Sequence, residues 1–189
     1  MSEARAAIGY ERRRQIQVRS AFEAGLARAD RDDPELTGFF LACAAYIIFS
    51  MDRLHYQDQV IHDLLKERIP ADDKEAHARL DALNERQGKS RELVEQLQRA
   101  TEELTINGAD ALGAFKTTAA DFVDAFTSLM APRKNPFHEY TDQLFTEEDW
   151  VEIADVTDES RSVEKELYAA VQVNAPDGLD PEAETVVYH

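Results

Sequence analysis

The 189-residue chain has few helix-breaking residues, with seven glycines and six prolines, and it has one cysteine. This scarcity, together with many Ala, Leu, Glu, Gln and Arg residues, favours helix throughout. Alternating strand patterns bounded by hairpin turns are absent from the sequence. The lone Cys43, in the apolar run FFLACAAYIIF, excludes an internal disulfide and is typical of a buried, reduced thiol. We therefore expect an all-α protein.

The N-terminus lacks a hydrophobic signal core, and the longest apolar run, 38–50, is too short to span a bilayer. Basic residues are in the minority, with 21 Lys and Arg against 38 Asp and Glu, for a net charge of −17. Such a charge repels nucleic-acid phosphates and anionic membrane surfaces. These features predict a cytoplasmic protein that binds neither nucleic acid nor membrane.

Catalytic signatures are missing as well. The sequence contains no P-loop, dinucleotide-binding fingerprint, nucleophile elbow or zinc motif. Carboxylates are plentiful, but in so acidic a chain their proximity in sequence does not indicate catalysis. The sequence therefore points away from an enzyme.

Helical periodicity divides the first 131 residues into four long segments, at about 9–30, 34–68, 73–104 and 110–131. Asp33 before Pro34 is the expected N-cap of the second segment, Asp72 or Asp73 that of the third, and Gly108 its end. Long helices with short connections predict an up-and-down four-helix bundle.

Gln87 and Ser90 interrupt the apolar seam of the third segment at mid-length. The favoured interpretation is a partly exposed edge. The alternative is a polar or ligand-binding layer, which four-helix bundles place at this depth.

After Pro132 the sequence predicts short extra helices and an extended acidic tail. In TEEDW, Thr146 is the expected N-cap and Asp149 takes the capping-box position. The expected units are a bundle over 1–155, a short helix over 156–173 and a tail over 174–189. The tail is too polar to form a core, so we expect it to be disordered, or ordered by lying on a partner or on its own bundle.

Two stretches resemble the hemerythrin-like (HHE cation-binding) family. They are HYQDQVIHDLL, after an aromatic-rich run, and FVDAFTSLMAPRKNPF followed by LFTEEDWVEIA. The resemblance covers roughly residues 10–155 and implies a hemerythrin-like four-helix bundle. Proteins of that family hold a non-haem di-iron centre with histidine and carboxylate ligands from all four helices.

Most of those ligands have no counterpart in this chain. The first segment has no histidine, and the fourth-helix histidine of the family falls at Ser128 or Leu129, with its glutamate at Arg133 or Lys134. Leucine cannot bind a metal, and arginine or lysine places a positive charge where the cation would lie. The resemblance is therefore to a degenerate member, and no cofactor is expected.

A reduced metal site is the alternative, because Asp52, His55, Asp58 or Gln59, and His62 recur at helical spacing. A mononuclear non-haem iron would take His55, Asp58 and His62, with help from His77 or Glu75. The two histidines are about 10 Å apart along the helix axis, which makes a shared ion awkward. The favoured interpretation is a solvated or partner-facing polar stripe.

A partner surface is expected in the stretch APRKNPFH. Arg133 and Lys134 form a basic pair between two prolines, which lower the entropic cost of presenting the loop. Phe137 is the expected aromatic anchor. The whole predicted surface comprises Arg133, Lys134, Asn135, Pro136, Phe137 and His138. A helix terminator with a solvated basic pair is the alternative.

The sequence thus predicts a non-catalytic accessory or interaction subunit, such as one in a larger redox enzyme complex, that binds another protein or itself. The alternative function is an iron sensor or carrier that uses the mononuclear site.

Overall fold

The computed structural model describes residues 3–28, 34–130, 137–154 and 157–182. Within these ranges the chain is all-α, as predicted. The four long helices are α1 (Glu3–Arg28), α2 (Pro34–Arg68), α3 (Lys74–Asn107) and α4 (Ala109–Met130). Three shorter helices follow, α5 (His138–Leu144), α6 (Glu147–Ala154) and α7 (Asp158–Asn174). The helix ends differ from the expected ones by a few residues, except that α1 begins about six residues earlier.

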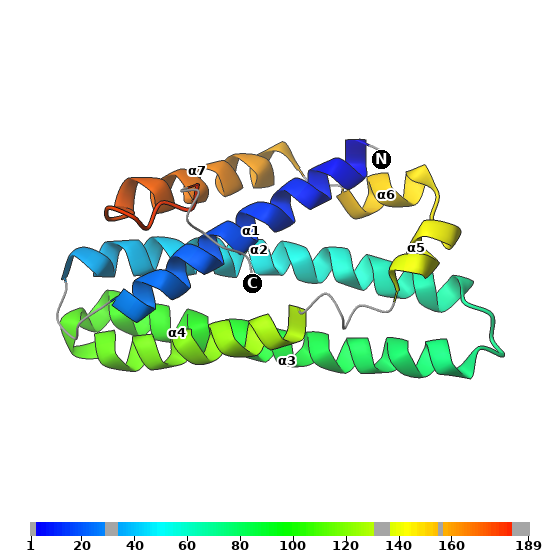
Figure 1. Ribbon diagram of the computed structural model, residues 1–189, viewed down its shortest axis with the longest axis horizontal. Coiled ribbons are helices and arrows are strands. Elements are labelled where there is room, and N and C mark those ends of the chain that lie inside the picture. The colour runs from blue at the N-terminus through cyan, green and yellow to red at the C-terminus, as the bar shows by residue number, and fades with distance from the viewer. Residues whose placement is uncertain (1–2, 29–33, 131–136, 155–156, 183–189) are drawn as a thin grey trace.

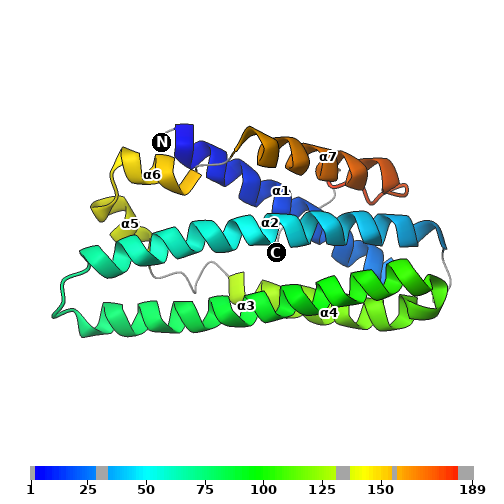
Figure 2. The ribbon, with the colours of Figure 1, turned by 180° about the vertical axis from the view of Figure 1, so that it is seen from behind.

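The long helices pack together and alternate in direction, with α2 at the centre (Figure 1, Figure 2). On one side of α2 lies the antiparallel pair α3 and α4. On the other side α1 crosses obliquely, and α7 runs beside it along α2. The short helices α5 and α6 contact the C-terminal half of α2, beyond the end of α4. The C-terminal helices therefore complete the packing around α2.

The central position of α2 accounts for its apolar sequence. Its most apolar 18-residue window has a mean hydropathy of 1.3, and the helical stretch Leu36–Arg68 is long and apolar enough, by length and composition, to cross a membrane. In this structure it is the helix that contacts α1, α3 and α7. A helix with neighbours on several sides has little room for a polar face.

Local capping signals set several helix ends. The Asp73 carboxylate accepts a hydrogen bond from the Ala76 amide at 3.0 Å, which confirms one of the two caps expected for α3. Gly108 ends α3 with a positive φ of 56°, a conformation that favours glycine. At α6 the Thr146 amide donates to Asp149 and the Asp149 amide to Thr146, which is the predicted capping box. Asp33 lies outside the described residues.

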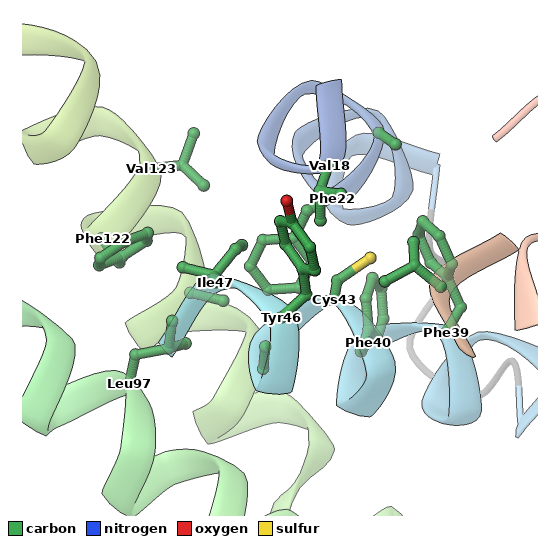
Figure 3. Close-up of a cluster of buried hydrophobic side chains, with 14 of the residues drawn as sticks. Val18, Phe22, Phe39, Phe40, Cys43, Tyr46, Ile47, Leu97, Phe122 and Val123 are labelled. Atoms are coloured by element: carbon green, nitrogen blue, oxygen red, sulfur yellow. The ribbon is translucent and has the colours of Figure 1, made fainter. Parts of the chain in front are cut away.

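The main core is rich in aromatic side chains and lies where α1, α2, α3, α4 and α7 meet, and Figure 3 shows the part of it around Phe22 and Phe40. The Phe22 ring packs edge-on against Phe40 and Phe115, with centroids 5.9 and 6.2 Å away. A Cβ atom at Gly25 would lie 2.8 Å from the Phe39 ring, so glycine lets α1 approach α2 here. Cys43 is buried in this core, as expected, and burial raises the pKa of its thiol.

The first half of the predicted tail lies on its own bundle, which is one of the expected alternatives. Leu179 is buried in the main core. The Arg28 guanidinium donates to the Asp177 carbonyl at 2.7 Å, and the Tyr168 hydroxyl donates to the Glu182 carboxylate at 3.3 Å. Residues 183–189 lie outside the described part of the chain.

Candidate functional site

A set of buried polar side chains lies along the middle of α1, α2 and α3. Its members are Gln15, His55, Gln57, His62, Gln87 and Ser90. Along α2 and α3 these residues fall between the main core and a second hydrophobic cluster, which comprises Leu65, Ile69, Ala76, Leu80 and Phe137. The interpretation of Gln87 and Ser90 as an exposed edge is therefore wrong. The polar stripe of α2, which comprises Asp52, His55, Asp58 or Gln59, and His62, is not a solvated surface along its whole length. Its two histidines, His55 and His62, are both buried.

His55 connects α2 to α3. Its Nε2 atom lies 3.0 Å from the Ser90 hydroxyl oxygen, and both side chains are buried. Burial lowers the pKa of His55, and the nearby Arg91 charge lowers it further, against the opposing effect of Asp52. The imidazole is therefore uncharged near neutral pH and offers one donor and one acceptor.

Asp58 faces a different neighbour, α1. Its carboxylate accepts a hydrogen bond from Arg12 at 3.0 Å. Burial raises the pKa of Asp58, and the Arg12 guanidinium acts in the opposite direction. His62 Nδ1 lies 3.1 Å from the Asp63 carboxylate, and His77 Nε2 lies 3.3 Å from the Pro70 carbonyl.

The four candidate metal ligands, His55, Asp58, His62 and His77, thus each have a different partner. In the ranges that the structure describes, no three His, Cys, Asp or Glu side chains gather as metal ligands would. The arrangement does not bring His55, Asp58 and His62 to one point, so the geometry gives the mononuclear iron site no support.

The predicted partner surface is only partly within the described residues. Arg133, Lys134, Asn135 and Pro136 lie outside them, and His138 begins α5. Phe137 is 2% exposed and packs in the second hydrophobic cluster, with its ring 6.0 Å from that of Tyr140. The expectation that Phe137 is the aromatic anchor of a partner surface therefore gains no support here, because the ring packs in the core of its own chain.

A groove of about 460 Å³ lies between α2 and α3 beside His55. Its walls comprise Asp52, His55, Tyr56 and Gln59 from α2, and Arg91, Val94, Glu95 and Gln98 from α3. Three of these residues, Asp52, His55 and Gln59, belong to the stripe that helical spacing singles out in the sequence. The residues from α3 carry no signal in the sequence that would connect them to it.

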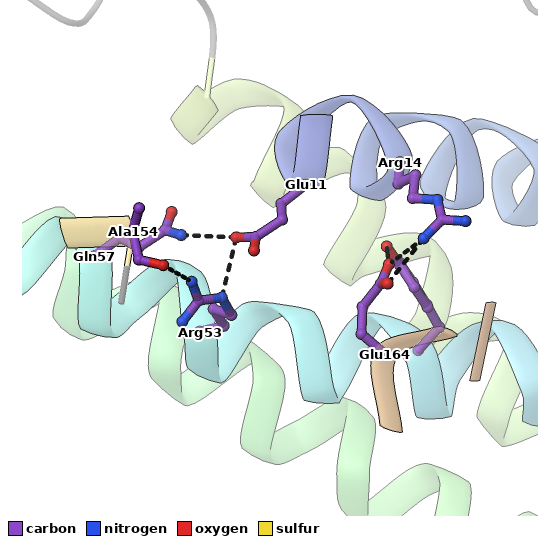
Figure 4. A network of polar contacts seen from close by, with 7 residues as sticks. Glu11, Arg14, Arg53, Gln57, Ala154 and Glu164 are labelled. Atoms are coloured by element: carbon purple, nitrogen blue, oxygen red, sulfur yellow. Dashed lines mark hydrogen bonds and ion pairs between the residues drawn. The ribbon is translucent and has the colours of Figure 1, made fainter. Parts of the chain in front are cut away.

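Sequence reasoning missed a charged network that joins α1, α2 and α7 (Figure 4). Arg14 donates to both carboxylate oxygens of Glu164, at 2.8 and 3.2 Å. The Tyr46 hydroxyl donates to the same carboxylate at 2.9 Å. The basic cluster YERRR in α1 is a signal for such a pair, but its partner lies 150 residues away.

A second part of the network lies one turn closer to the start of α1. The Glu11 carboxylate accepts hydrogen bonds from Arg53 at 3.0 Å and from Gln57 at 2.8 Å (Figure 4). Arg53 also donates to the Ala154 carbonyl at the end of α6, at 2.9 Å. Arg53 therefore connects α2 to both α1 and α6.

Gln87 differs from His55 and Ser90 in the set of buried polar side chains. Its amide nitrogen and oxygen are buried without a hydrogen-bond partner among the described residues. Replacing Gln87 by Met keeps the size and the helix propensity and removes the unsatisfied groups. We expect the free energy of unfolding in urea to rise by about 1 kcal/mol. The exposed Gln96 on the same helix is the matched control. Gln96→Met should change the free energy of unfolding by at most about 0.5 kcal/mol. A loss of stability in Gln87→Met would show that the amide has a partner.

Comparison with protein-family models, curated proteins and solved structures finds no match to this chain. The hemerythrin-like resemblance stays a prediction from the sequence.

Proposed function

We propose that the chain is a non-catalytic accessory or interaction subunit, built on a degenerate bundle of the hemerythrin-like type. The observation that carries the proposal is the pairing of its shielded charges across helices. Asp58 pairs with Arg12 on α1, Glu164 with Arg14, and Asp149 with Arg68 on α2. Charges engaged in holding helices together are poorly placed to act as general acids, general bases or metal ligands.

A protein partner is the interaction that the charge of the chain favours. A net charge of −17 disfavours nucleic acid and anionic lipid. Within this acidic chain Arg133 and Lys134 form an adjacent basic pair, and they stay the predicted contact with the partner. Because Phe137 is buried, recognition by this stretch would rest on charge.

The test is quantitative affinity purification from lysate of the source organism, together with sedimentation of the purified chain. The baits are the intact protein, R133E/K134E and the matched control R161E/K165E, which makes the same charge change on exposed positions of α7. We expect specific co-purifying proteins, or a dimer, that R133E/K134E loses and the control retains. A chain that stays monomeric and captures nothing reproducibly would overturn the proposal.

A further inference from the structure

The groove between α2 and α3 contains opposite charges that are not paired. Asp52 lies on its α2 wall and Arg91 on its α3 wall. Among the described residues neither has an ion-pair partner, and Arg91 makes one long hydrogen bond, to the Gln59 amide oxygen at 3.5 Å. Glu95 differs, because Arg99 lies 3.3 Å from its carboxylate.

The rest of the groove combines a polar side with an apolar side. The polar side includes His55, which lines the groove, is uncharged near neutral pH and is hydrogen-bonded behind the wall to the buried Ser90. The apolar side comprises Val94, which is buried, and the Tyr56 ring, which is 50% exposed. A few polar groups beside apolar contact area are typical of small-molecule sites, and the groove falls within their usual volume of roughly 300–1,000 Å³.

We propose that this groove binds a small zwitterion of the α-amino acid class. The carboxylate lies against Arg91, whose planar guanidinium suits a two-oxygen anion. The ammonium lies against Asp52, and the Tyr56 ring adds an attraction for a nearby cation. An apolar side chain of the ligand packs on Val94.

A zwitterion fits better than a ligand of one charge sign. A plain anion would be attracted to Arg91 but repelled by Asp52 and Glu95. A plain cation would be attracted to Asp52 and Glu95 but repelled by Arg91. A ligand with both charges satisfies the two walls together, and this binding does not depend on the proposed protein partner.

The test is titration calorimetry of the full-length chain with L-phenylalanine, L-leucine and L-glutamine as probes. N-acetyl-L-phenylalanine lacks the ammonium and L-phenylalaninamide lacks the carboxylate. We expect at least one free amino acid to bind, and both blocked forms of phenylalanine to bind at least tenfold more weakly than phenylalanine itself. Arg91→Gln and Asp52→Asn should each weaken binding of the free amino acid at least tenfold, whereas the exposed controls Arg161→Gln and Asp81→Asn should not.

Several results would overturn the proposal. One is the absence of binding by all three amino acids at about 10 mM, the weak end of specific recognition. Another is equal binding of free and blocked phenylalanine, which would mean that the groove does not recognise the ammonium and carboxylate groups of the ligand. A third is binding unchanged in both groove variants, which would place the amino acid elsewhere. Ligand-induced NMR shifts at His55 and Ser90 would support the groove, and shifts confined to other helices would contradict it.

Discussion

Replacing Glu164 by Gln is expected to lower the free energy of unfolding by about 2–3 kcal/mol, because it leaves a shielded guanidinium without its counter-charge. Glu164 accepts hydrogen bonds from Arg14 and from Tyr46, so one carboxylate joins α1, α2 and α7. The Arg14 and Glu164 side chains are only 16% and 17% exposed, which limits solvent screening. Arg14 also lies 4.0 Å from the centroid of the Tyr168 ring, a position that it holds through the same carboxylate.

The measurement is urea unfolding followed by circular dichroism. Glu166→Gln, at an exposed position two residues away, is the matched control and should shift stability by at most about 0.5 kcal/mol. Tyr46→Phe removes only the hydroxyl hydrogen bond and should cost about 1 kcal/mol. Equal effects of Glu164→Gln and Glu166→Gln would mean that the pair does not hold α7 on the bundle.

Acid is expected to remove roughly 1–2 kcal/mol of stability through Asp149, which is less than the full pKa shift implies because Arg68 is partly exposed and solvent screens the pair. Both Nη atoms of Arg68 donate to the Asp149 carboxylate, one of them at 2.6 Å. These bonds, and those from the Thr146 amide and hydroxyl, lower the pKa of Asp149 to about 2, against the opposing effect of burial.

The direction of the pH dependence follows from the depressed pKa. The folded state favours the ionised carboxylate, so this stability is fully present above the unfolded-state pKa of about 3.9. It is lost as the pH falls through about 2. The measurement is the difference in unfolding free energy between the native chain and Asp149→Asn at pH values from 7 to 2.

That difference should be largest at pH 7 and shrink toward zero at the acidic end, while other carboxylates titrate equally in both proteins. Glu148→Gln, at the exposed neighbouring position, should show no such trend. A difference that does not change with pH would mean that Asp149 acts through its capping geometry rather than through its charge.

The sequence by itself determined the class of fold and most of the helix ends. Asp73, Gly108 and the pair of Thr146 and Asp149 act on backbone groups within four residues, so their effect is local and can be deduced without the fold. The apolar seam of the third helix likewise follows from spacing, since residues three and four apart share a helix face. Burial of Cys43 follows from its apolar neighbours.

Only the tertiary structure decided which groups meet. Each residue turns a helix by about 100°, so His55 and Asp58 differ by about 60° in direction, enough for one to contact α3 and the other α1. Spacing alone placed both on one face and suggested a shared ion. In the same way, an aromatic residue after a proline can serve a partner or its own core, and packing against α2 and α3 put Phe137 in the core.

The Arg14–Glu164 pair and the groove at Arg91 depend on segments that are distant in the chain and meet only after packing. The physical reason is the distance along the chain over which each interaction acts. Capping and periodicity are local properties, whereas the partner of a charged side chain depends on the rotation and crossing of whole helices. The sequence determined that this protein is a helical bundle with many charges, and the packing around α2 decided which of those charges are paired across helices.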